Sequence, residues 1–204
     1  MIRRLLLVSA LVLGGCTTPE IRPVPADIQS AWQQRQVAMH ALHAWELHAR
    51  IAMQYGNDGG QASLFWIRAD HQNDIRLVGP WGKGLVRLNF NSHFAQLTDD
   101  TGQTTEGDDA ATLLYEATGW VIPVSKLDTW VTGMPVSQDA KIQLDKYGRL
   151  QSLVEAGWKI EYREYRQFGN QELPRRMVLS QQHVDGNGKT VSVKLVISQW
   201  QVSA

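Results

Sequence analysis

The sequence predicts a mainly β protein with a few short helices, built as an antiparallel sandwich or barrel of about eleven strands rather than a doubly wound sheet. Two observations predict this class. Short segments in which apolar and polar residues alternate recur through most of the chain, as they do in strands with one buried face. Clusters of Gly, Asp and Asn separate these segments, and such clusters are typical of tight turns.

The N-terminus has the features of a secretion signal that ends at a lipidation site. Arg3 and Arg4 precede an apolar run of about ten residues, which is too short to span a bilayer. Leu13-Gly14-Gly15-Cys16 follows and resembles a bacterial lipobox. The alternative is an ordinary signal peptide with a stray cysteine. We expect residues 1–15 to be removed and Cys16 to carry acyl chains that anchor a periplasm-facing protein.

The rest of the chain is long enough for one domain with its own core. We expect residues 16–26 to form the lipidated N-terminus and a flexible tether, since Pro19, Pro23 and Pro25 lie there. Residues 27–204 are expected to form the single domain. Basic and acidic residues balance at 20 each, which provides no electrostatic basis for binding nucleic acid. One cysteine excludes an internal disulfide and a cysteine-rich zinc site.

In the N-terminal half, one helix precedes an antiparallel meander. Asp27 is expected to cap a helix over residues 27–44, in which Trp32 and Met39 fall near helical spacing. Asn57-Asp58-Gly59-Gly60 predicts a hairpin turn. Alternation predicts strands that begin or end at this and later turns, over residues 47–55, 61–69, 74–79, 84–91 and 94–98.

In the C-terminal half, two helices interrupt the meander. Asp108 and Asp109 suit the N-terminus of a helix over residues 108–118, which Gly119 ends. Ser125 is expected to cap a second short helix that ends near Gly133. Further strands are predicted over residues 141–144, 149–156, 158–162, 175–183 and 191–200, with turns at residues 145–148 and 185–188.

Catalytic motifs are missing from the sequence. It contains neither the Gly-x-Ser-x-Gly elbow nor His-Glu-x-x-His, and residues 79–84 lack the spacing of a phosphate-binding loop. His40 and His43 lie three apart on the predicted helix, a spacing that metal ligands can have. Solvated or core-edge histidines explain them better, because no carboxylate or cysteine cluster accompanies them. We therefore expect no catalytic residue, no metal and no cofactor.

The chain contains eight tryptophans, a large apolar surface that needs a core or a ligand to cover it. Five of them fall on the inward-facing positions of their elements, and they permit two interpretations. They form an ordinary core, or they line a pocket, since an open barrel too wide for its own side chains leaves room for a hydrophobic guest. These residues are Trp32, Trp66, Trp130, Trp158 and Trp200.

Another tryptophan, Trp81, lies between Pro80 and Gly82 at the tip of a predicted loop between two strands. Its ring either folds back onto the sheet or protrudes as a hydrophobic finger that contacts lipid or an acyl chain.

These pieces together resemble the LolB family, the outer-membrane lipoprotein receptors of Gram-negative bacteria. Each matching segment is short, but their shared order and spacing run along nearly all of the chain after the signal. The matching residues are the lipobox, Ala31-Trp32-Gln33, Arg50, Leu64-Phe65-Trp66, Gly79-Pro80-Trp81-Gly82, Ile122-Pro123-Val124, Leu127, Trp130, Gly133-Met134-Pro135, Gly157-Trp158-Lys159, Tyr162 and Trp200.

The resemblance implies an unclosed antiparallel half-barrel whose apolar concave face is lidded by short helices. It also implies a monomer that is anchored in the outer membrane, accepts acylated lipoproteins from the periplasmic carrier LolA and inserts them into the outer membrane. An alternative is a periplasm-facing lipid-binding or structural lipoprotein that transfers no protein. Thr17 differs from the aspartate that resembles an inner-membrane retention signal, so sorting to the outer membrane is expected.

The resemblance also suggests residue roles. Trp66, Trp130, Trp158 and Trp200 become candidates to line the cavity that holds acyl chains. The loop of Pro80, Trp81 and Gly82 corresponds to one that carries a protruding apolar residue for membrane insertion. A leucine occupies the position of Trp81 in a comparable family member, and tryptophan favours the headgroup boundary more than leucine does.

Overall fold

The computed structural model describes residues 26–82, 84–182 and 190–203, with side chains for all of these except Trp81, Gln182 and Ser203. The predicted signal peptide, Cys16 and most of the tether lie outside the described residues. The described part of the chain contains α1 (Ile28–His40), α2 (Ala110–Thr118), α3 (Val124–Trp130) and the short 3-10 helix η1 (Pro80–Gly82). Its strands are β1 (Ala44–Tyr55), β2 (Asp58–Ala69), β3 (Gln72–Val78), β4 (Leu85–Phe90), β5 (Ala95–Thr98), β6 (Thr104–Gly107), β7 (Lys141–Leu144), β8 (Leu150–Glu155), β9 (Trp158–Phe168), β10 (Gln171–Gln182) and β11 (Thr190–Ser203).

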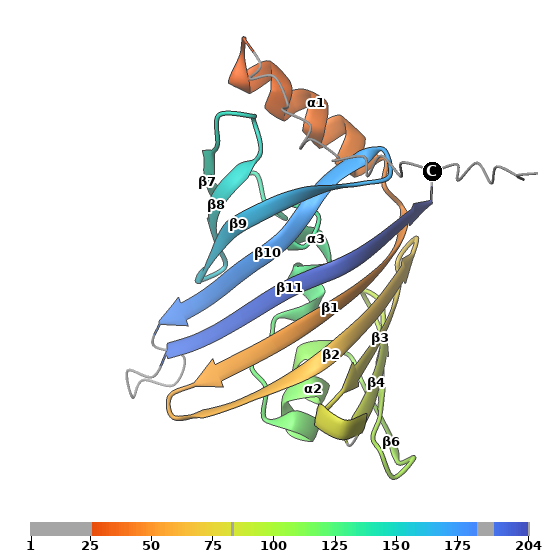
Figure 1. Cartoon of the computed structure of the whole chain (residues 1–204). Helices are drawn as coiled ribbons and strands as arrows, with labels where there is room; N and C mark the ends of the chain where they lie inside the picture. The colour runs from red at the N-terminus through yellow and green to blue at the C-terminus, as the bar shows by residue number, and fades with distance from the viewer. Residues whose placement is uncertain (1–25, 83, 183–189, 204) are drawn as a thin grey trace, which may run out of the picture.

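All of these strands belong to one antiparallel sheet, in the order β6-β5-β4-β3-β2-β1-β11-β10-β9-β8-β7. The first and last strands of the chain, β1 and β11, pair in the middle of the sheet. The two edge strands β6 and β7 lie at opposite ends of the order, so the sheet does not close. Figure 1 shows the sheet curved, with α2 and α3 on one side of it. The expected unclosed half-barrel with short helices is therefore confirmed.

The core lies between the sheet and these helices. Along β1, every second side chain is buried, from Trp45 through Leu47 and Ile51 to Met53, while the residues between them are more exposed. The buried Leu113 and Leu114 of α2 and the buried Leu127 and Trp130 of α3 complete this core. Alternation thus places one apolar face of the sheet under the helices and leaves the other face to solvent.

Local chemistry determines both ends of α2. The Asp109 carboxylate accepts hydrogen bonds from the N–H groups of Ala111 and Thr112, as predicted for the start of this helix. At the other end, Gly119 adopts a left-handed conformation with φ of 71°, and its N–H donates to the carbonyl of Tyr115 at 2.7 Å. The side-chain hydrogen bond from Thr112, with the backbone bonds, lowers the pKa of Asp109.

The other two helices differ from the prediction at one end each. Asp27 caps α1 as expected, but the helix ends at His40 rather than at residue 44, and β1 begins there instead. Trp45, Leu47 and Ala49 continue the two-residue alternation of β1, which overrides the helical spacing before them. His43 therefore lies outside the helix that carries His40. The helix α3 starts directly after Pro123, so the prediction that Ser125 caps it was wrong.

Two parts of the sheet were not predicted. The edge strand β6 has no apolar alternation, because all of its side chains are exposed or half-exposed. The strand β10 begins before Pro174, whereas the predicted strand began after it. Pro174 lies where the pairing of β10 with β9 shifts register, and a residue without an N–H is tolerated at such an irregularity.

A polar network holds α1 against the sheet. The Arg35 guanidinium donates to the carbonyl of Glu172 at 2.9 Å and to that of Thr132 at 3.3 Å, and it lies 5.1 Å from the ring centre of Tyr165. α1 also packs on the turn before β8, where Gly148 approaches it closely. The residues after α3 and the start of β10 are therefore linked through α1.

The buried residues of α3 are mainly apolar, but this helix also forms an ion pair with the sheet. Asp128 of α3 faces Arg68 of β2, with 4.0 Å between Oδ2 and Nε. Burial raises the pKa of Asp128, which the positive charge of Arg68 only partly offsets. Ionised Asp128 therefore costs free energy in the folded state. Among the described helices, none is long and apolar enough to cross a membrane.

Substitution at the α1 contact should reveal how firmly this helix is held. A Cβ on Gly148 would lie 2.7 Å from the Ala31 Cβ and 3.0 Å from the Ile28 carbonyl, whereas one on Gly102 would meet nothing within 4 Å. Both glycines have positive φ, so each alanine should cost about 1–2 kcal/mol of backbone strain. Urea unfolding should show a further loss of about 1–3 kcal/mol for Gly148→Ala only. Equal losses would show that α1 moves aside freely.

The pH dependence of stability should identify the burial cost at Asp128. Its folded-state pKa is raised, so the folded protein binds the proton more tightly than the unfolded chain. Asp128→Asn should therefore gain most stability over the wild type at neutral pH, and the gain should shrink as the pH falls towards 3.8, the unperturbed value. An amide oxygen can still accept the hydrogen bond that Thr129 donates.

The matched control for this measurement is Asp109→Asn, because the pKa of Asp109 is lowered rather than raised. Its ionised form is stabilised in the folded protein, so the advantage of the wild type should be largest near neutral pH and disappear in acid. Denaturant unfolding of both variants between neutral and acid pH provides the comparison. If both substitutions changed the free energy of unfolding at neutral pH in the same direction, the burial cost assigned to ionised Asp128 would be contradicted.

Candidate functional site

The concave face of the sheet is the candidate functional site, and its centre is aromatic. Trp66 of β2 and Trp200 of β11 both pair with Leu47 of β1, so β1 runs between them. Trp45, one alternation earlier on β1, packs edge-to-face on both indoles, with ring centres 5.3 Å from Trp66 and 5.2 Å from Trp200. Edge-to-face contacts of this kind are the favoured geometry for aromatic pairs.

Three interior indoles satisfy their N–H groups within the chain. Trp66 donates to the Asn73 side-chain oxygen at 2.8 Å, and Trp200 donates to the carbonyl of Pro174 at 3.1 Å. Trp130 donates to the Glu155 carboxylate at 2.6 Å.

Trp45 differs from these three. It is only 2% exposed, yet its indole N–H has no hydrogen-bond partner among the described residues. An unpaired buried donor costs about 1–3 kcal/mol.

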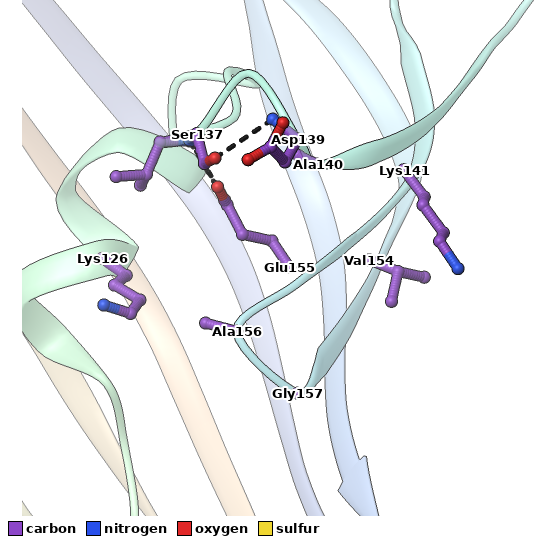
Figure 2. A pocket seen from close by; sticks show the side chains of 10 residues that line it. Lys126, Ser137, Asp139, Ala140, Lys141, Val154, Glu155, Ala156 and Gly157 are labelled. Carbon is purple, nitrogen blue, oxygen red and sulfur yellow. Dashed lines mark hydrogen bonds between the residues drawn. The ribbon is translucent and has the colours of Figure 1, made fainter.

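The Glu155 carboxylate holds the segment that follows α3. Besides the indole of Trp130, it accepts hydrogen bonds from the backbone N–H groups of Val136 and Ser137. Figure 2 shows Glu155 pointing towards Ser137 beside a pocket of about 340 Å³ whose walls include the side chains of Val154 and Lys141. The carboxylate is buried with three donors around it, which explains how a charge is tolerated there.

Trp158 lies at a different opening. It lines a largely apolar pocket of about 430 Å³. The other walls of this pocket come from the sheet, from α2 and from the connection between α2 and α3. Tyr115 of α2, which is 52% exposed, and Pro123 also line this pocket. A pocket of this size is in the usual range for small-molecule sites.

The predicted cavity-lining residues thus occupy two settings. Trp158 lines a pocket at the end of the concave face, while Trp66, Trp130 and Trp200 are buried among neighbouring side chains in this structure. Their role in holding acyl chains stays a prediction. Sequence reasoning missed Trp45, because the predicted first helix extended to residue 44 and the strand was expected to start only at Leu47.

The predicted insertion loop is η1, between β3 and β4. Pro80 and Gly82 are exposed, and a Cβ added at Gly82 or Gly84 would meet no atom within 4 Å. The two glycines of this loop therefore face open space. The side chain of Trp81 lies outside the described residues, so neither interpretation of it is tested. A mostly polar pocket of about 310 Å³ lies beside the loop and includes Arg50.

The described residues contain no group of three or more His, Cys, Asp or Glu side chains that could hold a metal ion.

Comparisons with known proteins agree with this architecture. Residues 43–200 match the family model described as outer membrane lipoprotein LolB. The outer-membrane lipoprotein LolB of Pseudomonas aeruginosa is 33% identical over 205 aligned positions, covering 98% of this chain and 96% of that protein. The protein of the same name from Pseudomonas putida is 32% identical over 171 positions, covering 83% of this chain and 80% of that one.

Among solved structures, a LolA superfamily protein from Nitrosomonas europaea superimposes with a TM-score of 0.54 at 7% identity, covering 88% of this chain and 95% of that one. A likeness at this identity supports the fold alone. The match of the family model over most of the chain and the identity to full-length relatives show the family, and the chain belongs to the LolB family of outer membrane lipoproteins.

Proposed function

We propose that this protein is anchored in the outer membrane through Cys16, accepts acylated lipoproteins from the periplasmic carrier LolA and inserts them into the outer membrane. The observation that carries the proposal is the half-barrel itself: an apolar concave face that short helices cover without closing the sheet, in a chain of the LolB family. The pocket beside Trp158, a residue of this face, supports the proposal because it is largely apolar.

The energetics of acyl chains explain why such a face is needed. A chain with more than a dozen methylenes would cost on the order of 10 kcal/mol if it were left in water. The chains must therefore pass by direct contact from one shielded environment to another. Transfer then runs downhill if this protein binds the chains at least as well as the carrier and the bilayer holds them better still.

The anchor and the loop serve the second half of the transfer. Lipidation at Cys16 would keep the protein at its destination and raise the effective concentration of loaded protein there. The exposed η1 loop would carry Trp81 into the headgroup boundary, where indole rings are favoured. Contact between loop and membrane would bring the concave face close to the lipid that receives the chains.

A second function is a lipid-binding or structural lipoprotein of the same fold that transfers no protein. Photo-crosslinking distinguishes the two. A crosslinker at Tyr115, in the wall of the pocket, should trap the loaded LolA carrier if this protein is a receptor. A matched crosslinker at Val196, which is on the opposite face of the sheet, should not trap it.

Trp81→Glu should separate acceptance from insertion. A carboxylate at the loop tip opposes entry into the membrane, but it does not change the concave face. The variant should therefore take acylated protein from the carrier about as well as the wild type and insert less than a tenth of it into liposomes. Phe94→Glu alters an exposed aromatic residue at another turn and should insert normally. Normal insertion by Trp81→Glu would refute the role of the loop.

A further inference from the structure

The unpaired N–H of Trp45 identifies a polar point inside the apolar face. Buried donors in proteins almost always have an acceptor, and the three other interior indoles described above each have one. Trp45 is equally buried and has none among the described residues. A donor kept in this state is suited to an acceptor that the chain itself does not supply.

The strand neighbour of Trp45 connects this position to α3. Trp45 pairs across the strands with Arg68 on β2, and both side chains belong to the face that the helices cover. Arg68 in turn approaches Asp128 of α3. Trp45 thus lies next to the strand position that α3 reaches. The acceptor can meet the N–H only when the side chains that bury Trp45 move apart.

The surroundings restrict the chemistry of the acceptor. Two indoles, Trp66 and Trp200, pack against Trp45, and an ionised group among them would lose its hydration without gaining a counter-charge. The cation that pairs with Trp45 across the strands, Arg68, already faces the carboxylate of Asp128. An uncharged carbonyl joined to alkyl chains needs no counter-charge and tolerates aromatic surroundings. It accepts one hydrogen bond from an indole, which can only donate, and its alkyl neighbours suit the aromatic wall.

We infer that the Trp45 indole N–H donates a hydrogen bond to an acyl ester carbonyl of the bound lipid moiety. This inference rests on the proposed function, in which acyl chains enter the concave face, and it adds a preference for acyl esters over plain hydrocarbon. Trp45 is then a specificity residue. Its contact would fix the depth of the chains, because the carbonyl marks the point where the alkyl chain ends.

Paired probes that differ only in the carbonyl test this inference. The protein is the full chain from residue 16 with Cys16→Ala, which removes the acyl anchor and the need for detergent. Dioctanoylglycerol carries two ester carbonyls, and the dioctyl ether of glycerol has the same shape without them. Displacement of a bound alkyl fluorophore should show about fivefold tighter binding of the diester, the value of one net hydrogen bond.

Trp45→Phe should abolish this preference while both probes still bind, because the ring stays apolar but the donor is lost. Trp120→Phe is the matched control. It also removes an indole N–H, but from a ring that lies beside Gly60, at the other end of β2 from the residue that pairs with Trp45, so the preference for the diester should remain. Equal binding of the two probes by the wild type, or an unchanged preference in Trp45→Phe, would overturn the inference.

A second measurement does not depend on the stability of the variants. In proton–nitrogen NMR spectra of the Cys16→Ala protein, the indole N–H signal of Trp45 should shift downfield when the diester binds, as expected for a new hydrogen bond. The same signal should not shift downfield when the diether binds. A shift confined to another tryptophan, or no shift when the diester is bound, would refute the role of Trp45.

The two proposals fail separately. If the protein takes no acylated protein from the carrier but keeps the diester preference, the contact at Trp45 stands and the transfer function fails. If transfer proceeds and the two probes bind equally, the transfer function stands and the role of Trp45 fails.

Discussion

The pairing of β1 with β11 in the middle of the sheet is the constraint on which the rest of the structure depends. It joins the first and last strands of the domain, so the two halves of the chain extend outwards from the centre in opposite directions. The edges are then β6 and β7, each only four residues long. Because these edges do not pair with each other, the sheet encloses only part of its apolar face.

The connection between the edges must therefore cross the open side. The chain leaves the sheet at β6 and returns at β7, and α2 and α3 lie between these two strands in the sequence. Figure 1 shows both helices on one side of the curved sheet. Their buried leucines and Trp130 belong to the same apolar core as the buried residues of the strands. The helices are thus a cover over the open side that strand topology makes necessary. Glu155 and Arg35 fix the end of this cover by binding backbone groups that follow α3.

Local signals explain which parts of this fold the sequence could predict. The capping aspartates Asp27 and Asp109 and the left-handed Gly119 act within one helical turn, so their residue types alone indicated the helix ends. The strand β6 could not be predicted because it is held by pairing with β5 and buries no side chain of its own. Pro174 within β10 depends on a register shift that only the partner strand β9 determines.

The site was less predictable than the fold, for a physical reason. Periodicity shows which tryptophans face inwards, and those predicted to do so are buried. It does not show which indole N–H finds an acceptor, because Asn73, Pro174 and Glu155 accept from indoles that belong to other elements. The lack of a partner for the Trp45 N–H among the described residues is a property of the three-dimensional packing, which periodicity does not encode. The start of β1, the strand that carries Trp45, was also not predicted, because residues with helical spacing precede it.

The packing of the concave face constrains how a guest could be held there. In this structure the face is largely covered by side chains of the chain itself, and each large apolar side chain that moves into water costs about 1.5–3 kcal/mol. Moving four such side chains, as on α2 and α3, into water would cost on the order of 10 kcal/mol. This cost is comparable to the free energy gained by burying one acyl chain. The exchange is then nearly balanced. A near balance would suit the proposed transfer, because the bilayer would shield the chain fully while the helices returned to the face they had left.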